Sequence, residues 1–404
     1  MKVLQMNCVY GEGSTGRITK EIHNALLHDG INSAVLYGRG KNTSEKNVYR
    51  VCSNFYAKCN RFISSVTGIP YGGCVLSTNK IIKIIRKEKP DVVHIQCING
   101  YFVNIYKLIS WLKSSGIPTV ITLHAEFMYT ANCGHAFACD GWKSGCKDCQ
   151  IPKEATKSWF FNRTTESFDK MRRAFDGFGN LKIVSVSPWL RERAEQSLIL
   201  RGKAHETVLN GVNTNVFRYI DSKEVLKRHN IQGKKVILHV TAMFRDKEND
   251  IKGGKYIIEF AEKMQNESVV FIVAGKYELQ NKLPENVILL GNINENLLAE
   301  YYSVADITVL TSKRETYSMV CAESLCCGTP IVGFCAGAPE MISIPEYSAF
   351  VPYGNVDELC SKIHGMIDNG FSKKEISFTA SKIYSETTMI KEYKDIYRRM
   401  LCDK

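Results

Sequence analysis

Two patterns of apolar residues alternate along the first half of the chain. Short, nearly continuous apolar runs are typical of strands buried on both faces, and they occur at 3–8, 34–37, 91–95, 119–123 and 182–186. Between these runs, apolar residues recur at helical spacing over 18–28, 81–87, 105–114 and 188–197. Strands that alternate with helices of this length predict a parallel sheet covered by helices on both faces.

The alternation restarts after the turn signal Asn210-Gly211. Further strands are predicted at 236–241, 269–274, 287–290, 307–310 and 330–333, and further helices at 254–264, 295–303 and 318–327. The sequence therefore predicts an α/β protein of two Rossmann-like domains, the N-terminal one over 1–205 and the C-terminal one over 206–385. An amphipathic helix over 386–404 is expected to pack back on the N-terminal domain. Ligands of such sheets bind outside the carboxyl ends of the strands, so we expect a site in a cleft between the domains.

Composition agrees with a globular protein of two domains. The chain has 404 residues, of which 44% are hydrophobic and 23% are charged. It has no run of 18 or more apolar residues and no secretory pattern at its start, so we expect a cytoplasmic protein whose 15 cysteines are mostly reduced. The net charge of +12 fits an anionic membrane face, a nucleic acid or a phosphorylated substrate, or simply a lysine-rich solvated surface.

The strongest chemical signal follows the predicted strand at 307–310. Glu315 lies in a polar loop, and Glu323 lies about two turns into the helix that begins near Ser318. The first amides of a helix bind anions, and carboxylates accept hydrogen bonds from paired hydroxyls of a sugar or a ribose. The alternative interpretation is that Glu315 only caps the helix electrostatically and that Glu323 is solvated.

The spacing of these two glutamates, with Gly328-Thr-Pro330 and Gly337-Ala-Pro-Glu340 after them, closely resembles the signature of family 4 glycosyltransferases, which are retaining enzymes of the GT-B fold. The resemblance implies that Glu315 contacts hydroxyls of the donor sugar in the catalytic site and that Glu323 contacts the nucleotide ribose. Tyr317-Ser318 stands where the family usually has Phe-Gly. Tyr317, Ser318 and Met319 are expected to face the donor, and Ile293 is expected to lie near the base of its nucleotide.

Two cations complete the predicted donor site. Arg245 and Lys252-Gly253 look like the Arg and Lys-Gly pair with which the family binds the donor diphosphate. A leaving diphosphate gains negative charge as the glycosidic bond breaks, and preorganised cations stabilise it. Lys247 and Lys255 are alternative cations nearby, and a merely solvated basic loop is the alternative interpretation. The segments 187–193 and 210–217 also resemble family segments, which close the first domain and link it to the second.

The N-terminal domain carries a glycine loop and two histidines at strand ends. Gly11-x-Gly13-x-x-Gly16 matches a dinucleotide fingerprint, but no acid occurs between Gly30 and Glu45 to bind the ribose of NAD, which leaves an NADP interpretation through Arg39. In a glycosyltransferase, Gly13 would let the backbone approach the donor phosphate or the acceptor. His124 matches a recurrent histidine of the family and is assigned to the catalytic site, and His94 to the acceptor side. Either one is also compatible with a satisfied core histidine.

Four cysteines lie close together in an insertion over 131–150, and they are Cys133, Cys139, Cys146 and Cys149. Only the last pair has a spacing familiar from zinc sites, so the pattern favours a closed structural zinc site over disulfides and over unligated thiols, without excluding either. A similar insertion occurs in glycosyltransferases of the capsule and colanic-acid type. The following segment, 153–182, is rich in basic and aromatic residues, which fits either a membrane surface or a helix whose aromatics pack inward.

Together with these features, the family resemblance implies a retaining glycosyltransferase that moves a hexose-type sugar from a nucleoside-diphosphate sugar to a saccharide or lipid-linked saccharide acceptor in surface polysaccharide synthesis. No catalytic metal and no nucleic-acid partner are expected. The protein is expected in the cytoplasm, and the lipid-linked acceptors that the resemblance implies would bring it into peripheral contact with the inner membrane face. Two alternatives stay open: an NADP-dependent oxidoreductase, and a non-catalytic binding module stabilised by zinc.

Overall fold

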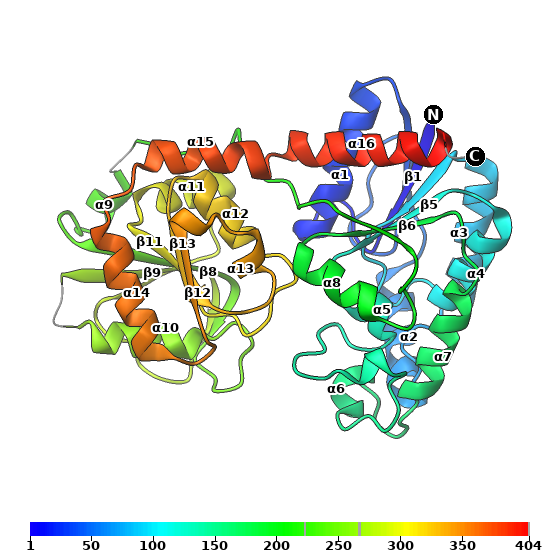
Figure 1. Cartoon of the computed structure of the whole chain (residues 1–404), viewed down its shortest axis with the longest axis horizontal. Coiled ribbons are helices and arrows are strands. Elements are labelled where there is room, and N and C mark those ends of the chain that lie inside the picture. The colour runs from blue at the N-terminus through cyan, green and yellow to red at the C-terminus, as the bar shows by residue number, and fades with distance from the viewer. Residues whose placement is uncertain (222–223, 266–267, 403–404) are drawn as a thin grey trace. The chain divides into compact units, whose positions relative to one another are not determined.

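The chain divides into two compact units in the computed structural model, which describes residues 1–221, 224–265 and 268–402 (Figure 1). The first unit comprises Met1–Leu209 together with the chain from Ile390 onward, and the second comprises Asn210–Met389. Residues 222–223 and 266–267 of the expected C-terminal domain, and 403–404 of the expected last helix, lie outside the described residues.

The described part of the first unit contains a seven-stranded, entirely parallel sheet with the order β3-β2-β1-β4-β5-β6-β7. Its strands are β1 (Lys2–Asn7), β2 (Asn32–Tyr37), β3 (Val48–Arg50), β4 (Val92–Ile95), β5 (Thr119–Leu123), β6 (Leu181–Ser185) and β7 (Ala204–Thr207). Every residue of β4 and β5 is buried, which explains their continuous apolar runs. The short edge strands β3 and β7 have no such run, and the apolar pattern did not predict them.

Helices connect these strands, and three of them begin or end at recognisable capping residues. They are α1 (Gly13–His28), α2 (Asn54–Thr67), α3 (Val75–Glu88), α4 (Ile105–Ser115), α5 (Phe127–Thr130), α6 (Pro152–Thr156), α7 (Thr164–Phe175) and α8 (Pro188–Gln196), with a 3₁₀ turn at Gly141–Lys143. The Asn104 side chain accepts a hydrogen bond from the Lys107 amide at the start of α4, and Ser187 does the same for Leu190 at the start of α8. Gly68 and Gly116 end α2 and α4 in the left-handed conformation.

The second unit repeats the architecture with a six-stranded parallel sheet, in the order β10-β9-β8-β11-β12-β13 over the described residues. Its strands are β8 (Lys235–Arg245), β9 (Val269–Glu278), β10 (Val287–Gly291), β11 (Ile307–Leu310), β12 (Ile331–Phe334) and β13 (Ser348–Val351). Its helices are α9 (Glu224–Arg228), α10 (Gly254–Lys263), α11 (Glu295–Val304), α12 (Met319–Cys326), α13 (Pro339–Ile342), α14 (Val356–Asp368) and α15 (Lys373–Tyr384), with a 3₁₀ turn at Pro345–Tyr347. The predicted α/β class with two parallel sheets is confirmed.

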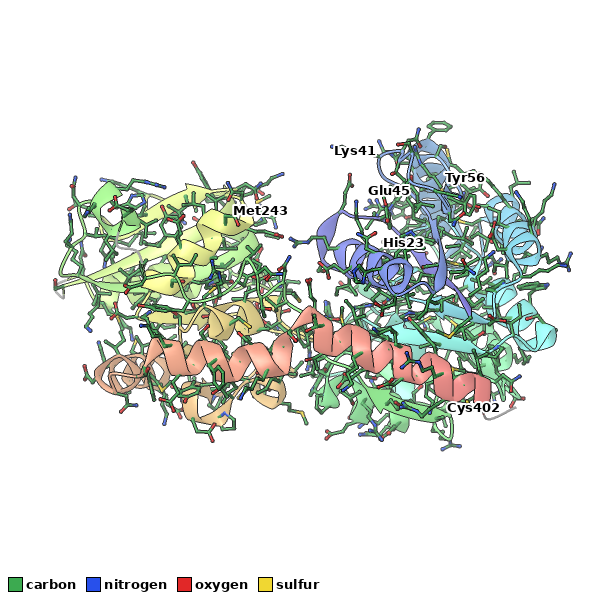
Figure 2. All side chains as sticks on the ribbon, turned by 90° about the horizontal axis from the view of Figure 1, so that it is seen from above. His23, Lys41, Glu45, Tyr56, Met243 and Cys402 are labelled. Carbon is green, nitrogen blue, oxygen red and sulfur yellow. The ribbon has the colours of Figure 1, made fainter. Side chains whose placement is uncertain are left out.

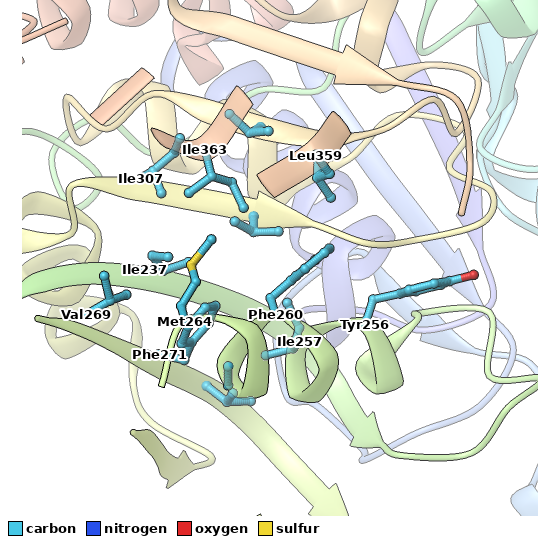
Figure 3. Packing of buried hydrophobic residues seen from close by; sticks show 14 of the residues in the cluster. Ile237, Tyr256, Ile257, Phe260, Met264, Val269, Phe271, Ile307, Leu359 and Ile363 are labelled. Carbon is cyan, nitrogen blue, oxygen red and sulfur yellow. The ribbon is translucent and has the colours of Figure 1, made fainter. Parts of the chain in front are cut away.

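Helices α10 and α14 pack on one face of this second sheet. Ile257 and Phe260 of α10 and Leu359 and Ile363 of α14 are fully buried with strand residues such as Phe271 (Figure 3). This apolar layer fixes the strands whose carboxyl ends carry the predicted donor residues.

The last helix, α16 (Glu386–Cys402), contributes to the core of the first unit. The hydroxyl of Tyr397 lies 2.6 Å from Nδ1 of His94, and the hydroxyl of Tyr393 lies 2.9 Å from Oγ1 of Thr122. All four side chains are buried. The chain from Ile390 onward thus packs on the N-terminal sheet, where its tyrosines give hydrogen-bond partners to buried polar groups that would otherwise have none.

Gly275, near the carboxyl end of β9, has no room for a side chain. Its φ is +133°, and a Cβ atom there would lie 1.7 Å from the Thr241 carbonyl oxygen. We expect Gly275→Ala to lower the free energy of unfolding by more than about 3 kcal/mol, because it adds a backbone clash to an unfavourable φ. The matched control is Gly233→Ala, where φ is +80° but nothing lies within 4 Å, and its cost should stay near about 1 kcal/mol. Equal midpoints of urea unfolding for the two variants would contradict the clash.

Candidate functional site

The loop between β11 and α12 is held in place by main-chain hydrogen bonds to a second loop. The Glu315 amide donates to the Ala336 carbonyl (3.0 Å), and the Ala338 amide donates to the Glu315 carbonyl (3.2 Å). The carboxylate of Glu340 accepts from the amides of Ala336 and Gly337, at 3.1 and 2.8 Å. Residues 337–340 of the family-like motif therefore shape the loop that presents Glu315.

Glu315 and Lys252 meet directly, although 63 positions separate them in the chain. Nζ of Lys252 lies 2.6 Å from Oε1 of Glu315. Thr311 Oγ1 donates to the Lys252 carbonyl at 2.8 Å, so the loop after β8 and the loop after β11 are tied at two points. The Lys252 side chain remains 36% exposed and that of Glu315 17%, so a ligand can reach both. A cation and a carboxylate are thus held side by side at the carboxyl ends of neighbouring strands.

Arg245 ends β8 and is linked to Lys252 through Asp250. Oδ1 of Asp250 accepts from the Lys252 amide at 2.7 Å, and its Oδ2 lies 3.5 Å from Nη1 of Arg245. Nε of Arg245 also donates to Glu278 at 2.9 Å, and Lys247 donates to the same carboxylate. Hydrogen bonds from Lys247 and Arg245 lower the pKa of Glu278 to about 2. The sequence analysis did not identify the acids Asp250 and Glu278 as partners of these cations.

The start of α12 adopts a backbone conformation that suits glycine better than serine. Ser318 has φ +98° and ψ +92°, and its Oγ accepts a long hydrogen bond of 3.4 Å from the Cys321 amide. The family glycine at this position is therefore explained by backbone geometry. The Tyr317 side chain is buried, and its hydroxyl donates to the Asn210 carbonyl at 2.8 Å. Tyr317 thus anchors the loop to the start of the second unit, and Met319 begins the helix.

Glu323 is only 8% exposed, so the interpretation of a solvated carboxylate is wrong. The hydroxyl of Tyr302, which is fully buried, donates to Oε2 of Glu323 at 3.2 Å. Burial raises the pKa of this tyrosine well above its usual value, so it stays a proton donor. Ile293, predicted at the base, lies half-buried between β10 and α11. Hydrogen bonds and an ion pair through Asp250 join Arg245, Lys252 and Glu315 in one network, and Tyr302 orients Glu323.

The glycine loop of the first unit is built around Asn7. The Gly11 amide donates to the Gly16 carbonyl at 2.9 Å, and Gly13 begins α1 with φ +64°. The Asn7 side chain donates to the Val9 carbonyl at 2.8 Å and accepts from the Cys97 amide at 3.0 Å. Beside the loop, Glu45 accepts from the hydroxyl of Tyr10 and from Lys20, and Figure 2 shows Glu45 near α1.

The two predicted histidines occupy different environments. Both ring nitrogens of His94 are engaged in the core, by Tyr397 and by Thr122, and burial lowers its pKa to about 3. This is the arrangement of a satisfied core histidine, and His94 is not included in the acceptor site proposed below. His124 is half-buried at the end of β5, where Nε2 lies 2.8 Å from Oε1 of Gln96. Burial lowers its pKa to about 4, so it is neutral at pH 7.

The cysteine insertion packs around a buried ion pair that the sequence interpretation missed. Glu126 is fully buried and lies 3.2 Å from Nη2 of Arg193, whose guanidinium stacks over Trp142 and Trp189 at 4.9 and 5.0 Å from the ring centroids. The sequence could have indicated this ion pair, because Glu126 closely follows a predicted strand and Arg193 lies in the family-like segment 187–193.

The four clustered cysteines are free thiols in the structure, and each is partly exposed. Burial, with a smaller contribution from the neighbouring thiols, raises the pKa of Cys133 and of Cys146 to about 12. Over the described ranges, the chain has no group of three or more His, Cys, Asp or Glu side chains that could hold a metal ion. The predicted structural zinc site and the predicted disulfides therefore gain no support from the structure.

The aromatic residues after α6 do not pack inward. Trp159, Phe160 and Phe161 are 57%, 71% and 49% exposed, so the packed-helix interpretation of this part of segment 153–182 is wrong. Helix α7 begins only at Thr164, and its apolar residues do face the core. In the part of the chain that the structure describes, no helix is long and apolar enough to cross a membrane.

Comparisons with known proteins agree with this geometry. The profile of Glycosyltransferase Family 4 matches residues 15–216, and that of Glycosyl transferases group 1 matches residues 234–369. Over 163 residues the chain is 24% identical to the putative colanic acid biosynthesis glycosyl transferase WcaC of Escherichia coli K12, a match covering 37% of this chain and only 39% of that protein. Over 303 residues it is 23% identical to the uncharacterized glycosyltransferase MJ1178 of Methanocaldococcus jannaschii, covering 71% and 76% of the two chains.

Among solved structures, that of Anabaena Alr3699/HepE in complex with UDP is similar over 99% of this chain and 100% of that chain, with a TM-score of 0.68 and 14% identity. The same Anabaena protein has also been solved with UDP-glucose. At this identity the likeness shows the fold, which is GT-B. With its two parallel-sheet units and a family profile that spans half its length, the chain belongs to glycosyltransferase family 4.

Proposed function

We propose that this protein is a retaining glycosyltransferase that moves a hexose-type sugar from a nucleoside-diphosphate sugar to a saccharide or lipid-linked saccharide acceptor in surface polysaccharide synthesis. The observation that carries the proposal is the contact of Lys252 with Glu315, joined through Asp250 to Arg245. It supplies two cations for a diphosphate and a carboxylate for sugar hydroxyls in one place. The Anabaena structures with UDP and UDP-glucose support a nucleotide-sugar donor for this fold.

In the proposed reaction, Lys252, Arg245 and the amides at the start of α12 hold the diphosphate. Charge on that diphosphate grows as its bond to the sugar breaks, so these groups bind the transition state more tightly than the ground state. Glu315 accepts hydrogen bonds from the sugar hydroxyls. Glu323, held by Tyr302, accepts from the ribose hydroxyls.

Retention requires that the acceptor approach the face that the diphosphate leaves. The acceptor hydroxyl attacks the sugar carbon from that side, and the departing phosphate oxygen takes its proton. No catalytic metal is required in this scheme, since the cations of the chain neutralise the leaving group. The N-terminal unit takes the acceptor side, with neutral His124 as a hydrogen-bonding contact to the donor sugar or the acceptor and Gly13 letting the backbone approach the ligand.

A lipid-linked acceptor fits an exposed surface of the first unit, which we define as the aromatic patch. Its large apolar residues are Phe55, Phe62, Ile63, Trp159, Phe160 and Phe161. Trp159 packs edge-on against Phe62 with ring centroids 5.5 Å apart, and its amide donates to the Ser65 carbonyl at 2.7 Å, so the patch joins α2 to the segment after α6.

The charge around the aromatic patch favours an anionic surface. Lys58 and Arg61 are exposed on α2, whose sequence has no acidic residue, and Lys157 is exposed beside Trp159. Aromatic side chains enter the interface of a bilayer while basic ones attract its anionic headgroups. We propose that the protein sits at the cytoplasmic face of the membrane through this patch.

The donor site is tested by substitution at its two partners. We expect Lys252→Ala and Glu315→Ala each to lower the rate of nucleoside-diphosphate release about 10²–10³-fold, because each removes a preorganised charge from the reacting centre. The matched control is Lys263→Ala, which removes an exposed lysine of α10 paired with Asp357. Near-native rates for both site variants would rule out the assignment.

The donor class is tested by ligand-induced stabilisation. Thermal unfolding with UDP-, GDP- and ADP-sugars should show one base raising the midpoint, since a ligand at 100 times its Kd adds about 2.7 kcal/mol. Lys252→Ala should abolish that increase. Stabilisation by NADPH and by none of the nucleotide sugars would instead favour the oxidoreductase alternative.

The membrane proposal is tested with vesicles. The double variant Phe62→Ser/Trp159→Ser should lose most of its co-sedimentation with vesicles that contain phosphatidylglycerol, because burial of two aromatic side chains contributes several kcal/mol to binding. Phe378→Ser is the control, since Phe378 is 64% exposed on α15 of the second unit. Unchanged sedimentation of the double variant would refute the role of the aromatic patch.

A further inference from the structure

Two cysteines continue neighbouring strands of the first unit. In the parallel register of β1 and β4, Met6 pairs with Ile95. Cys8 and Cys97 each follow two residues later, just beyond the ends of these strands. The Cys8 amide donates to the Cys97 carbonyl at 2.8 Å, so the two backbones are still adjacent there. Neighbouring strands lie about 4.7–4.9 Å apart, within the Cα separation of about 4.4–6.8 Å that a disulfide requires.

The surroundings of Cys8 favour its thiolate. Interaction with the neighbouring Cys97 side chain and the positive charge of Arg39 outweigh burial and lower the pKa of Cys8 to about 7. The Cys97 thiol itself donates to Oδ1 of Asn99 at 3.2 Å. The Arg39 amide donates to the Cys8 carbonyl at 2.9 Å, which keeps the two residues together. A Cβ atom placed on Gly100 would lie 2.9 Å from the Cys8 Cβ and 3.4 Å from Nε of Arg39, which puts both side chains against the same turn.

Three buried thiols show the opposite shift in pKa. Burial raises the pKa of Cys74, Cys321 and Cys326 to about 12, so these sulfurs stay protonated and unreactive at pH 7. Cys8 and Cys97 are both partly exposed, which a small oxidant needs in order to reach them.

We propose that Cys8 and Cys97 are a modification site: a dithiol that a hydroperoxide such as hydrogen peroxide oxidises to a disulfide. The Cys8 thiolate attacks the peroxide O–O bond and becomes a sulfenic acid, and hydroxide leaves. The Cys97 thiol then attacks the Cys8 sulfur, an S–S bond forms, and water leaves with the thiol proton. Two thiols and one hydrogen peroxide thus give one disulfide and two waters.

A disulfide between Cys8 and Cys97 would lie next to the glycine loop and change how this loop is joined to the sheet. Cys8 directly precedes the glycine loop, and Asn7 already links the Cys97 amide to the Val9 carbonyl and lies 3.3 Å from Oγ1 of Thr15. The disulfide would replace a hydrogen-bonded junction between β1, β4 and this loop with a covalent one. The proposal does not depend on the proposed transfer reaction.

The test is peptide mapping of the full-length reduced protein after hydrogen peroxide, with free thiols alkylated and no reductant added. We expect a peptide pair joined through Cys8 and Cys97. Cys97→Ser should instead accumulate a sulfenic acid on Cys8 that dimedone traps, and Cys8→Ser should leave Cys97 free. Cys335→Ser, which removes an exposed thiol of the second unit, is the control and should keep the cross-link.

A second measurement separates reactivity from folding effects of the variants. In the unmodified protein, alkylation of Cys8 by iodoacetamide should rise through pH 7, following its lowered pKa, and should be faster at pH 7 than alkylation of Cys335. The proposal is overturned if peroxide leaves both Cys8 and Cys97 fully alkylatable while Cys335 is oxidised, or if Cys8 at pH 7 reacts no faster than Cys335.

Discussion

The contact between the Lys252 ammonium and the Glu315 carboxylate, at 2.6 Å, defines the candidate donor site. It depends on a feature of parallel sheets: the carboxyl ends of β8 and β11, which are neighbours, place their following loops at one edge. The hydrogen bond from Thr311 to the Lys252 carbonyl adds a second tie between the loops. The apolar layer under these strands, with Phe260 and Phe271 at its centre, keeps the edge in place.

The charges at this edge are balanced before any ligand arrives. Asp250 accepts from Lys252 and Arg245, and Glu278 accepts from Arg245 and Lys247. Each cation is therefore positioned by an acid of the same chain, which lowers the cost of ordering it when an anion binds. Buried Glu323, oriented by Tyr302, is preorganised in the same way.

Much of the fold followed from the apolar pattern, because strands buried on both faces leave continuous runs such as that of β5. The apolar pattern did not predict the edge strands β3 and β7, because most of their residues are only half-buried and leave no continuous apolar run. The family resemblance assigned both Lys252 and Glu315 to the donor site, but it did not predict their direct contact. The acidic partners of Arg245 and Lys252 were not predicted either, because Asp250 and Glu278 contact these cations through hydrogen bonds that form only in the folded loops.

The remaining site predictions depended on burial, which a sequence specifies poorly. His94 lies within β4 and His124 directly follows β5, and the hydroxyl of Tyr397 of α16 lies 2.6 Å from Nδ1 of His94 in the core. Tyr317 occupies a ligand-loop position in the motif but turns its hydroxyl to the Asn210 carbonyl. The four cysteines are close in sequence, but among the described residues their sulfurs do not join any group suited to a metal ion.

Calorimetric titration of two ligands tests most directly whether Lys252 binds the diphosphate and Glu315 binds the sugar. The ligands are the preferred nucleoside diphosphate and the corresponding nucleotide sugar. The account predicts that Lys252→Ala weakens binding of both, whereas Glu315→Ala weakens binding of the nucleotide sugar and leaves that of the diphosphate unchanged or tighter, because the lysine is released from its partner. Equal weakening of both ligands by Glu315→Ala, or unchanged diphosphate affinity in Lys252→Ala, would contradict it.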